Sequence, residues 1–202
     1  MGILKDYLTS KNLENLNREM LTFVANIDMV ARKNPFVAKI IVKELIDQRR
    51  NLKLIASENF CSFPAQNAMS NLLTDIVLVN VADLGLTGRQ AENALRECGL
   101  TLNRNAFPYD ENGSWYTSGL RLGTPAVTTL GMGRDEMMET ADIMAVVLKN
   151  VKPSVNKKGV PSKTKYVLDE NIKIKSTRRT TDILDRFILH PEINIDFFVK
   201  YF

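Results

Sequence analysis

The first part of the chain has apolar residues at helical spacing. Between residues 13 and 30 they recur every three or four positions, at Leu16, Met20, Val24 and Ile27. This spacing predicts an amphipathic helix. Asn34 followed by Pro35 predicts the start of a second helix, with a side-chain cap and proline in the first turn. We expect this second helix to end at Arg50.

From Ile76 the pattern changes to short strands. The β-branched run of residues 76–81 predicts a buried strand, and residues 100–103 and 118–123 predict two more. Thr87 and Gln90 have the spacing of a capping box, so a helix is expected to begin there and to stop at Gly99.

A long helix is expected from Arg134, because Asp135 and Glu136 place acids in its first turn and Lys149 a base in its last. The order of strands and helices then predicts an α/β fold with an α+β-like layer. In it, N-terminal helices precede a small α/β domain with a short, roughly three-stranded sheet.

The charge is concentrated in one segment. The chain has a net charge of +4, but residues 149–179 hold ten basic and two acidic residues and leave the remainder at −4. With Pro153, Gly159, Pro161 and one aromatic residue, this segment is interpreted as a solvated linker rather than as a nucleic-acid site. The expected organisation is an N-terminal helical segment (1–75), a small α/β domain (76–151), a basic linker (152–179) and a C-terminal helix and tail (180–202).

Composition excludes several classes of protein. The 202 residues include two cysteines, Cys61 and Cys98, which form no CxxC motif, and one histidine, His190. A zinc finger is therefore excluded, no metal site is expected, and free thiols in a reducing compartment are favoured. Because no apolar run is long enough to span a membrane and the first residues do not resemble a secretory signal, we expect a cytoplasmic protein without membrane contact.

Several motifs resemble one enzyme family. The run LIASENF lies at residues 54–60, LNRNAFP at 102–108 and TSGLRLGTPA at 117–126. Together with residues 84–92 and 128–132, they resemble serine hydroxymethyltransferase over most of residues 36–151. That resemblance implies transfer of a one-carbon unit between serine and tetrahydrofolate with pyridoxal phosphate, yielding glycine. It also implies the C-terminal domain fold of fold-type I pyridoxal phosphate enzymes. Residues 184–195 are similar to the end of longer bacterial members.

The resemblance assigns three site residues. Ser57 matches the family's serine that contacts the amino-acid substrate, and Arg121 matches the arginine that grips its carboxylate. Asn105 matches an asparagine that contacts the folate pteridine. Each position also has a structural interpretation: the end of a helix or turn for Ser57, an ion pair for Arg121 and a turn before Pro108 for Asn105.

The sequence departs from the family near Asp75–Ile76. Family members have nearly the whole cofactor-binding domain between the segments that match residues 71–75 and 76–79, and here it is absent. The family's Schiff-base lysine follows a threonine run and a histidine, whereas His190 precedes Pro191. Since such an enzyme needs an aldimine lysine and an acidic partner for the ring nitrogen, no catalytic residue is assigned, and Glu58 is given no such role.

The expected function follows from both observations. The chain is interpreted as an internally truncated member of the family that is catalytically defective alone and binds neither pyridoxal phosphate nor tetrahydrofolate stably. The alternative is a non-catalytic module that associates with an intact subunit. Self-association into a homo-oligomer is also expected. In the family the first helices pack on the large domain, and without that domain apolar faces such as that of residues 36–45 would be exposed. A product of gene deletion without selected function stays open, and nucleic-acid binding through residues 149–179 is the least favoured interpretation.

Overall fold

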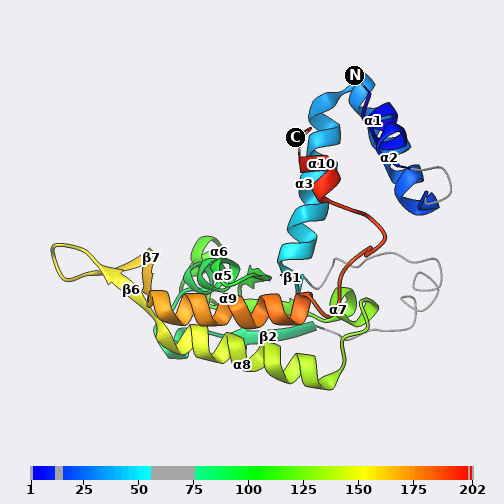
Figure 1. Cartoon of the computed structure of the whole chain (residues 1–202). Coiled ribbons are helices and arrows are strands. Elements are labelled where there is room, and N and C mark those ends of the chain that lie inside the picture. Colours follow the sequence, from blue (N-terminus) through cyan, green and yellow to red (C-terminus); the bar gives the residue numbers. More distant parts are fainter. Residues whose placement is uncertain (1, 12–15, 56–75, 200, 202) are drawn as a thin grey trace. The chain divides into compact units, whose positions relative to one another are not determined.

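The computed structural model describes residues 2–11, 16–55, 76–199 and 201 (Figure 1). The chain divides into two compact units, one formed by residues 1–49 with 188–202 and the other by residues 50–187. Ser57, Glu58, Cys61 and Asp75 lie outside the described residues.

The first unit is helical. It contains α1 (Ile3–Thr9), α2 (Arg18–Lys33), α3 (Pro35–Arg50) and the short α10 (Asp196–Val199). The predicted cap of α3 is present, because Asn34 Oδ1 accepts a hydrogen bond of 3.2 Å from the backbone N–H of Val37. The buried side chains of this unit include Tyr7, Val24, Val42 and Phe198.

Arg49 fastens the C-terminal segment within this unit. Its Nε donates to the carbonyl oxygen of Leu189 over 2.8 Å, and Nη2 donates to that of Ile193 over 2.8 Å. Nη2 also donates to the carbonyl oxygen of His190. One guanidinium therefore satisfies three backbone acceptors of a segment that has little regular structure of its own.

The second unit is built on an antiparallel sheet in the order β2 (Ile76–Asn80), β5 (Gly119–Gly123), β4 (Asn103–Asn105). Beside it, β1 (Leu52–Lys53) pairs in parallel with β3 (Leu100–Thr101). The two sheets are linked at Leu54, whose N–H donates to Thr101 over 2.7 Å and whose carbonyl accepts from Gly123 over 2.9 Å. The predicted three-stranded sheet of a small α/β domain is confirmed.

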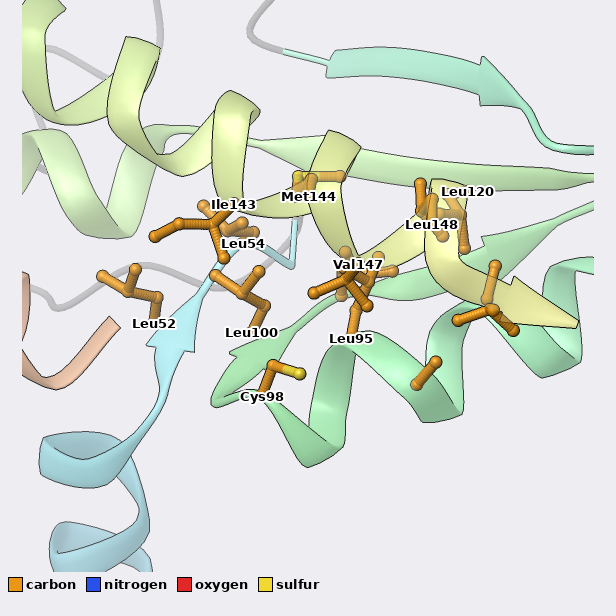
Figure 2. Packing of buried hydrophobic residues seen from close by; sticks show 14 of the residues in the cluster. Leu52, Leu54, Leu95, Cys98, Leu100, Leu120, Ile143, Met144, Val147 and Leu148 are labelled. Atoms are coloured by element: carbon orange, nitrogen blue, oxygen red, sulfur yellow. The ribbon is translucent and has the colours of Figure 1, made fainter. Parts of the chain in front are cut away.

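The core of this unit lies between the strands and three helices, α5 (Gly88–Glu97), α8 (Arg134–Asn150) and α9 (Glu170–Leu184). Figure 2 shows Leu95, Leu100 and Val147 converging from α5, β3 and α8. All three are fully buried, and burying each side chain contributes about 1.5–3 kcal/mol. Short helices complete the unit: η2 (Ala82–Leu84), α6 (Gly113–Tyr116) and α7 (Pro125–Thr129).

The predicted start and stop of α5 are confirmed. Thr87 Oγ1 accepts from the N–H of Gln90, and Gln90 Oε1 accepts from the N–H of Thr87, which completes the capping box. Gly99 has a φ of +82°, the left-handed conformation that ends many helices. Cys98 beside it is a free, buried thiol, and burial raises its pKa to about 11.

Residues 100–103 do not form the single strand that was expected. The strand breaks at Leu102, so β3 belongs to one sheet and β4 to the other. Leu100 and Leu102 are both fully buried in the same core. An alternating pattern alone does not show that its two halves pair with different strands.

The structure does not match the expectation of a basic linker at residues 152–179. These residues form β6 (Val151–Val155), β7 (Pro161–Leu168) and most of α9. The two strands pair as an antiparallel hairpin, and Asp169 Oδ1 caps α9 by accepting from Asn171 and Ile172. The prediction from charge overlooked a two-residue alternation, in which Tyr166 and Leu168 pack against the core while Lys163, Lys165 and Val167 are exposed. The last long helix consequently begins at Glu170, ten residues before the expected Thr180.

Candidate functional site

Arg121 and Asn105 lie on the same face of the three-stranded sheet. Asn103 is opposite Arg121 and Asn105 is opposite Gly119, so Arg121 and Asn105 are diagonal neighbours on adjacent strands. Such neighbours are about 7–8 Å apart. Leu120, between Gly119 and Arg121, is fully buried in the core, so alternation directs the Arg121 side chain to the opposite face. The fold therefore brings together two of the three site residues that the sequence predicted.

The Arg121 guanidinium has a buried donor without an acceptor among the described residues. Its Nε is buried and, within the part of the chain that the structure describes, has no hydrogen-bond partner. A buried N–H without an acceptor costs about 1–3 kcal/mol, so an acceptor at this position would be stabilising. A carboxylate is suited to it, because its two oxygens match the parallel donors of a guanidinium.

The loop between β4 and β5 folds against this face. Gly119 has no room for a side chain, because a Cβ there would lie 2.5 Å from the Phe107 ring and 2.8 Å from the carbonyl oxygen of Asn105. The Phe107 ring therefore lies directly over β5, beside the backbone of Asn105. This contact sets the position at which Asn105 leaves the sheet.

Asp110 organises the same loop. Its carboxylate accepts from the N–H of Ser118 over 2.7 Å, from the Ser118 hydroxyl over 2.5 Å and from the N–H of Asn112 over 2.9 Å. Burial raises the pKa of Asp110, but hydrogen bonds from Ser118, Asn112 and Phe107 lower it further, so its pKa lies below the ordinary value. The ionised carboxylate thus fixes the loop that leads into β5.

Thr117 precedes Ser118 in a strained conformation. Its φ is +57° and its ψ is 164°, a region that is essentially restricted to glycine. The residue is buried, and its carbonyl oxygen accepts a hydrogen bond of 2.9 Å from the N–H of Gly88 at the start of α5. The packing of α5 against β5 therefore keeps Thr117 in this strained conformation. Thr117 lies two residues before β5, the strand that contains Arg121.

Asn105 borders a shallow hollow of about 370 Å³, formed by residues of β4, α5 and the following loop. Its Nδ2 donates to the carbonyl oxygen of Ala106 over 2.8 Å. The amide oxygen takes no part in that bond and points away from it. On the rim, Arg104 donates to Glu92 over 2.6 Å. An amide beside a charged pair can both donate to and accept from a heterocyclic ligand.

Sequence reasoning missed the supports of this site. Neither the Asp110–Ser118 hydrogen bonds nor the Phe107–Gly119 contact was expected. The available signals were the Asp-x-Asn spacing of a turn at residues 110–112 and a glycine inside a predicted strand, which marks a close backbone approach. Ser57, the third predicted site residue, lies outside the described residues, so its assignment stays a prediction.

The described residues do not fit pyridoxal phosphate. All the lysines except Lys200 lie in the described ranges, and none of them is on β4 or β5 with Asn105 and Arg121. Of these lysines, Lys53 alone is buried, on β1 of the other sheet. The nearby acids are engaged, since Glu92 pairs with Arg104 and Asp110 holds the loop. The aldimine lysine and the free acid that the cofactor needs are not combined at this face.

The described ranges contain no group of three or more His, Cys, Asp or Glu side chains that could hold a metal ion. None of their helices combines the length and apolarity needed to cross a bilayer.

Comparison with known proteins agrees with the motifs. The sequence model of the family described as serine hydroxymethyltransferase matches residues 74–144. The chain is 47% identical over 120 residues to serine hydroxymethyltransferase of Salinispora tropica, a match that covers 59% of this chain and 25% of that protein. It is 46% identical over 121 residues to that of Chlamydia muridarum, covering 60% and 24%. For the enzyme of Treponema pallidum the identity is 46% over 127 residues, covering 63% and 22%. The chain spans about a quarter of the length of these curated relatives.

Proposed function

We propose that this chain, which contains a serine hydroxymethyltransferase segment over residues 74–144, retains part of that family's substrate-binding surface but does not catalyse the reaction alone. The observation that supports this most directly is the buried, unpartnered Nε of Arg121. It lies on one sheet face with Asn105, and neither β4 nor β5 contains a lysine. An anion-binding group is thus present on these strands without a lysine beside it that would hold the cofactor.

The ligands proposed for this surface come from the family. Arg121 would bind the carboxylate of serine or glycine, and Asn105 would contact the pteridine of tetrahydrofolate. Ser57 is proposed as a further contact to the amino acid. Because the partners of pyridoxal phosphate are missing, we propose that neither it nor the folate is bound stably, and that the protein acts in the cytoplasm.

An internal deletion explains the missing partners. The family match begins at residue 74, next to the proposed junction at Asp75–Ile76. Residues 54–60 upstream of it also resemble the family, so matching segments flank the point at which the cofactor-binding domain would lie. We propose that the domain was lost at this point, leaving the small domain with an N-terminal helical segment.

The test is turnover by the purified chain. Serine, tetrahydrofolate and pyridoxal phosphate are supplied, and glycine is measured by mass spectrometry, with the enzyme of Treponema pallidum as the positive control. We expect no glycine above the level of a sample without protein. Glycine production that scales with the concentration of this chain would overturn the proposal.

A second candidate is a module that associates with an intact subunit. Its specific support is the surface of α3, where Phe36 is 69% exposed, Ile40 48% and Ile41 38%. An exposed apolar group of this kind usually marks an interaction surface. The same surface would serve self-association of the chain into a homo-oligomer.

This candidate is tested by mixing the chain with the intact enzyme and measuring mass by light scattering after size-exclusion chromatography. A mixed species is expected, and it should disappear in the double variant Phe36→Ser, Ile40→Ser. Met29→Ser is the matched control, because Met29 is 64% exposed but lies on α2. A mixture that elutes as separate components at micromolar concentration would rule this candidate out.

A further inference from the structure

The hairpin of β6 and β7 is anchored firmly to α5. Gln90 Nε2 donates to the carbonyl oxygens of Ser162 over 2.7 Å and Lys165 over 2.8 Å, and Thr87 Oγ1 donates to that of Lys163 over 2.9 Å. Gln90 is almost completely buried. Since these bonds hold backbone atoms of β7, they fix which side of the hairpin faces the solvent, and Figure 1 shows the hairpin extending away from α5 and α9.

The solvent side of the hairpin is strongly basic. Residues 151–168 contain five lysines and no acidic residue. All five are exposed, at positions 152, 157, 158, 163 and 165. The ion pairs of the described residues involve none of them, whereas Lys173 on α9 is paired with Glu97. The hairpin therefore presents five positive charges that the fold does not neutralise, on a chain whose remainder outside residues 149–179 is net negative.

Two aromatic rings, the exposed Trp115 and the half-buried Tyr116, lie next to this basic surface. Trp115 on α6 is 63% exposed, and the guanidinium carbon of Arg89 lies 5.3 Å from its ring centroid. The neighbouring Tyr116 ring lies 5.5 Å from Lys163 Nζ on the hairpin. Cation–aromatic contacts thus connect α5, α6 and β7 into one surface, in which a large ring and several cations are accessible together.

We propose that this surface, the lysines of the hairpin with Arg89 and Trp115, binds single-stranded nucleic acid. Lysines attract the phosphate backbone, and an exposed ring offers a platform on which an unpaired base stacks. The exposed Trp115 favours a single strand over a duplex, whose bases are already stacked. The sequence favours a solvated linker over a nucleic-acid site for residues 149–179, but residues 151–168 of this segment form a hydrogen-bonded hairpin.

The test measures fluorescence anisotropy of a labelled 20-nucleotide oligouridine RNA titrated with the whole chain at several salt concentrations. The triple variant Lys157→Gln, Lys158→Gln, Lys163→Gln should bind at least about tenfold more weakly. Its slope of log affinity against log salt should also be shallower by about 2, because each lost phosphate contact on a single strand contributes about 0.7. Trp115→Ala should weaken binding by about tenfold through lost stacking.

The matched control is Lys33→Gln, Lys39→Gln, Lys43→Gln, which removes the same charge from exposed lysines of α2 and α3. It should keep the affinity and the salt slope, and thermal melts should show that every variant is folded. Equal losses in the two triple variants would overturn the proposal, since binding would then depend on net charge alone. It would also be overturned if the hairpin variant lost binding to phosphatidylserine-containing vesicles but kept its affinity for the RNA.

Discussion

Arg104 donates from Nη1 to the carboxylate of Glu92 over 2.6 Å, and this ion pair joins β4 to α5. Glu92 is buried and also accepts from Arg96 over 3.3 Å. On the adjacent strand, Arg121 is half-buried but its Nε has no such partner in the described residues. Two arginines of one small sheet therefore differ in their roles, because one is satisfied by the fold and the other is left able to bind a ligand.

This difference predicts opposite responses to the same substitution. Arg104→Met should lower the free energy of unfolding by about 2 kcal/mol, because it leaves the buried Glu92 carboxylate with a weaker partner. Arg121→Met should change that free energy by less than about 1 kcal/mol, since an unsatisfied buried N–H is removed with the charge. Urea denaturation of both variants measures the difference. Equal destabilisation would show that Arg121 has a structural partner.

Gln90 is expected to be essential for the hairpin. Gln90→Ala removes one half of the capping box and leaves two carbonyl groups of β7 without their donor. We expect a loss of about 2–3 kcal/mol in unfolding free energy and faster amide exchange in residues 161–168. Gln48→Ala on α3 is the control, because Gln48 donates to an exposed neighbour on the same helix, Glu44, and its loss should cost less than about 0.5 kcal/mol. Unchanged exchange in the hairpin of Gln90→Ala would contradict this role.

Asp110 makes stability depend on pH. Its pKa is lower in the folded chain than in the unfolded one, so its contribution is complete above the ordinary aspartate pKa of about 3.9. The contribution is lost as the pH falls through the lowered folded pKa, when the proton competes with the hydrogen bonds of Ser118.

Asp110→Asn should therefore be less stable than the parent at pH 7, with the gap narrowing below about pH 4. Thermal melts between pH 2.5 and 7 measure it, with Asp182→Asn, an exposed aspartate of α9, as the control. A gap that stays constant over this range would show that the carboxylate charge is not what holds the loop.

The strained backbone at Thr117 predicts an unusual order of stability. Thr117→Ala keeps the strain and removes packing, whereas Thr117→Gly relieves a conformation that only glycine adopts readily. We expect the glycine variant to be about 1 kcal/mol more stable than the alanine variant, despite the greater flexibility of glycine in the unfolded chain. Chemical denaturation compares the two. An alanine variant of equal or higher stability would contradict the strain.

Local signals in the sequence predicted the helices well. Asn34, Thr87 and Gln90 cap helices as their residue types and spacing indicate, because capping depends on neighbours within four residues. Arg121 and Asn105 were each assigned as site residues through the family resemblance, and the register of β4 and β5 places them on one face of the sheet.

Signals that depend on distant partners were missed. The hairpin at residues 151–168 was not predicted, because its many lysines are also typical of a solvated linker. The hydrogen bonds that hold it come from Gln90 and Thr87, more than seventy positions earlier in the chain. The division of residues 100–103 between two sheets likewise depends on distant pairing partners, Leu52 opposite Leu100 and Arg121 opposite Asn103. Neither relation is visible in the local alternation of apolar and polar residues.

Borohydride trapping tests most directly the proposal that no lysine of the described ranges is placed to hold pyridoxal phosphate. The purified chain is titrated with pyridoxal phosphate, reduced and mapped by peptide mass spectrometry, with spectra recorded before and after glycine is added. The account predicts weak labelling scattered over exposed lysines of residues 149–175 and no spectral response to glycine. A stoichiometric adduct on one lysine, the buried Lys53 above all, together with a glycine-dependent spectral change would contradict it.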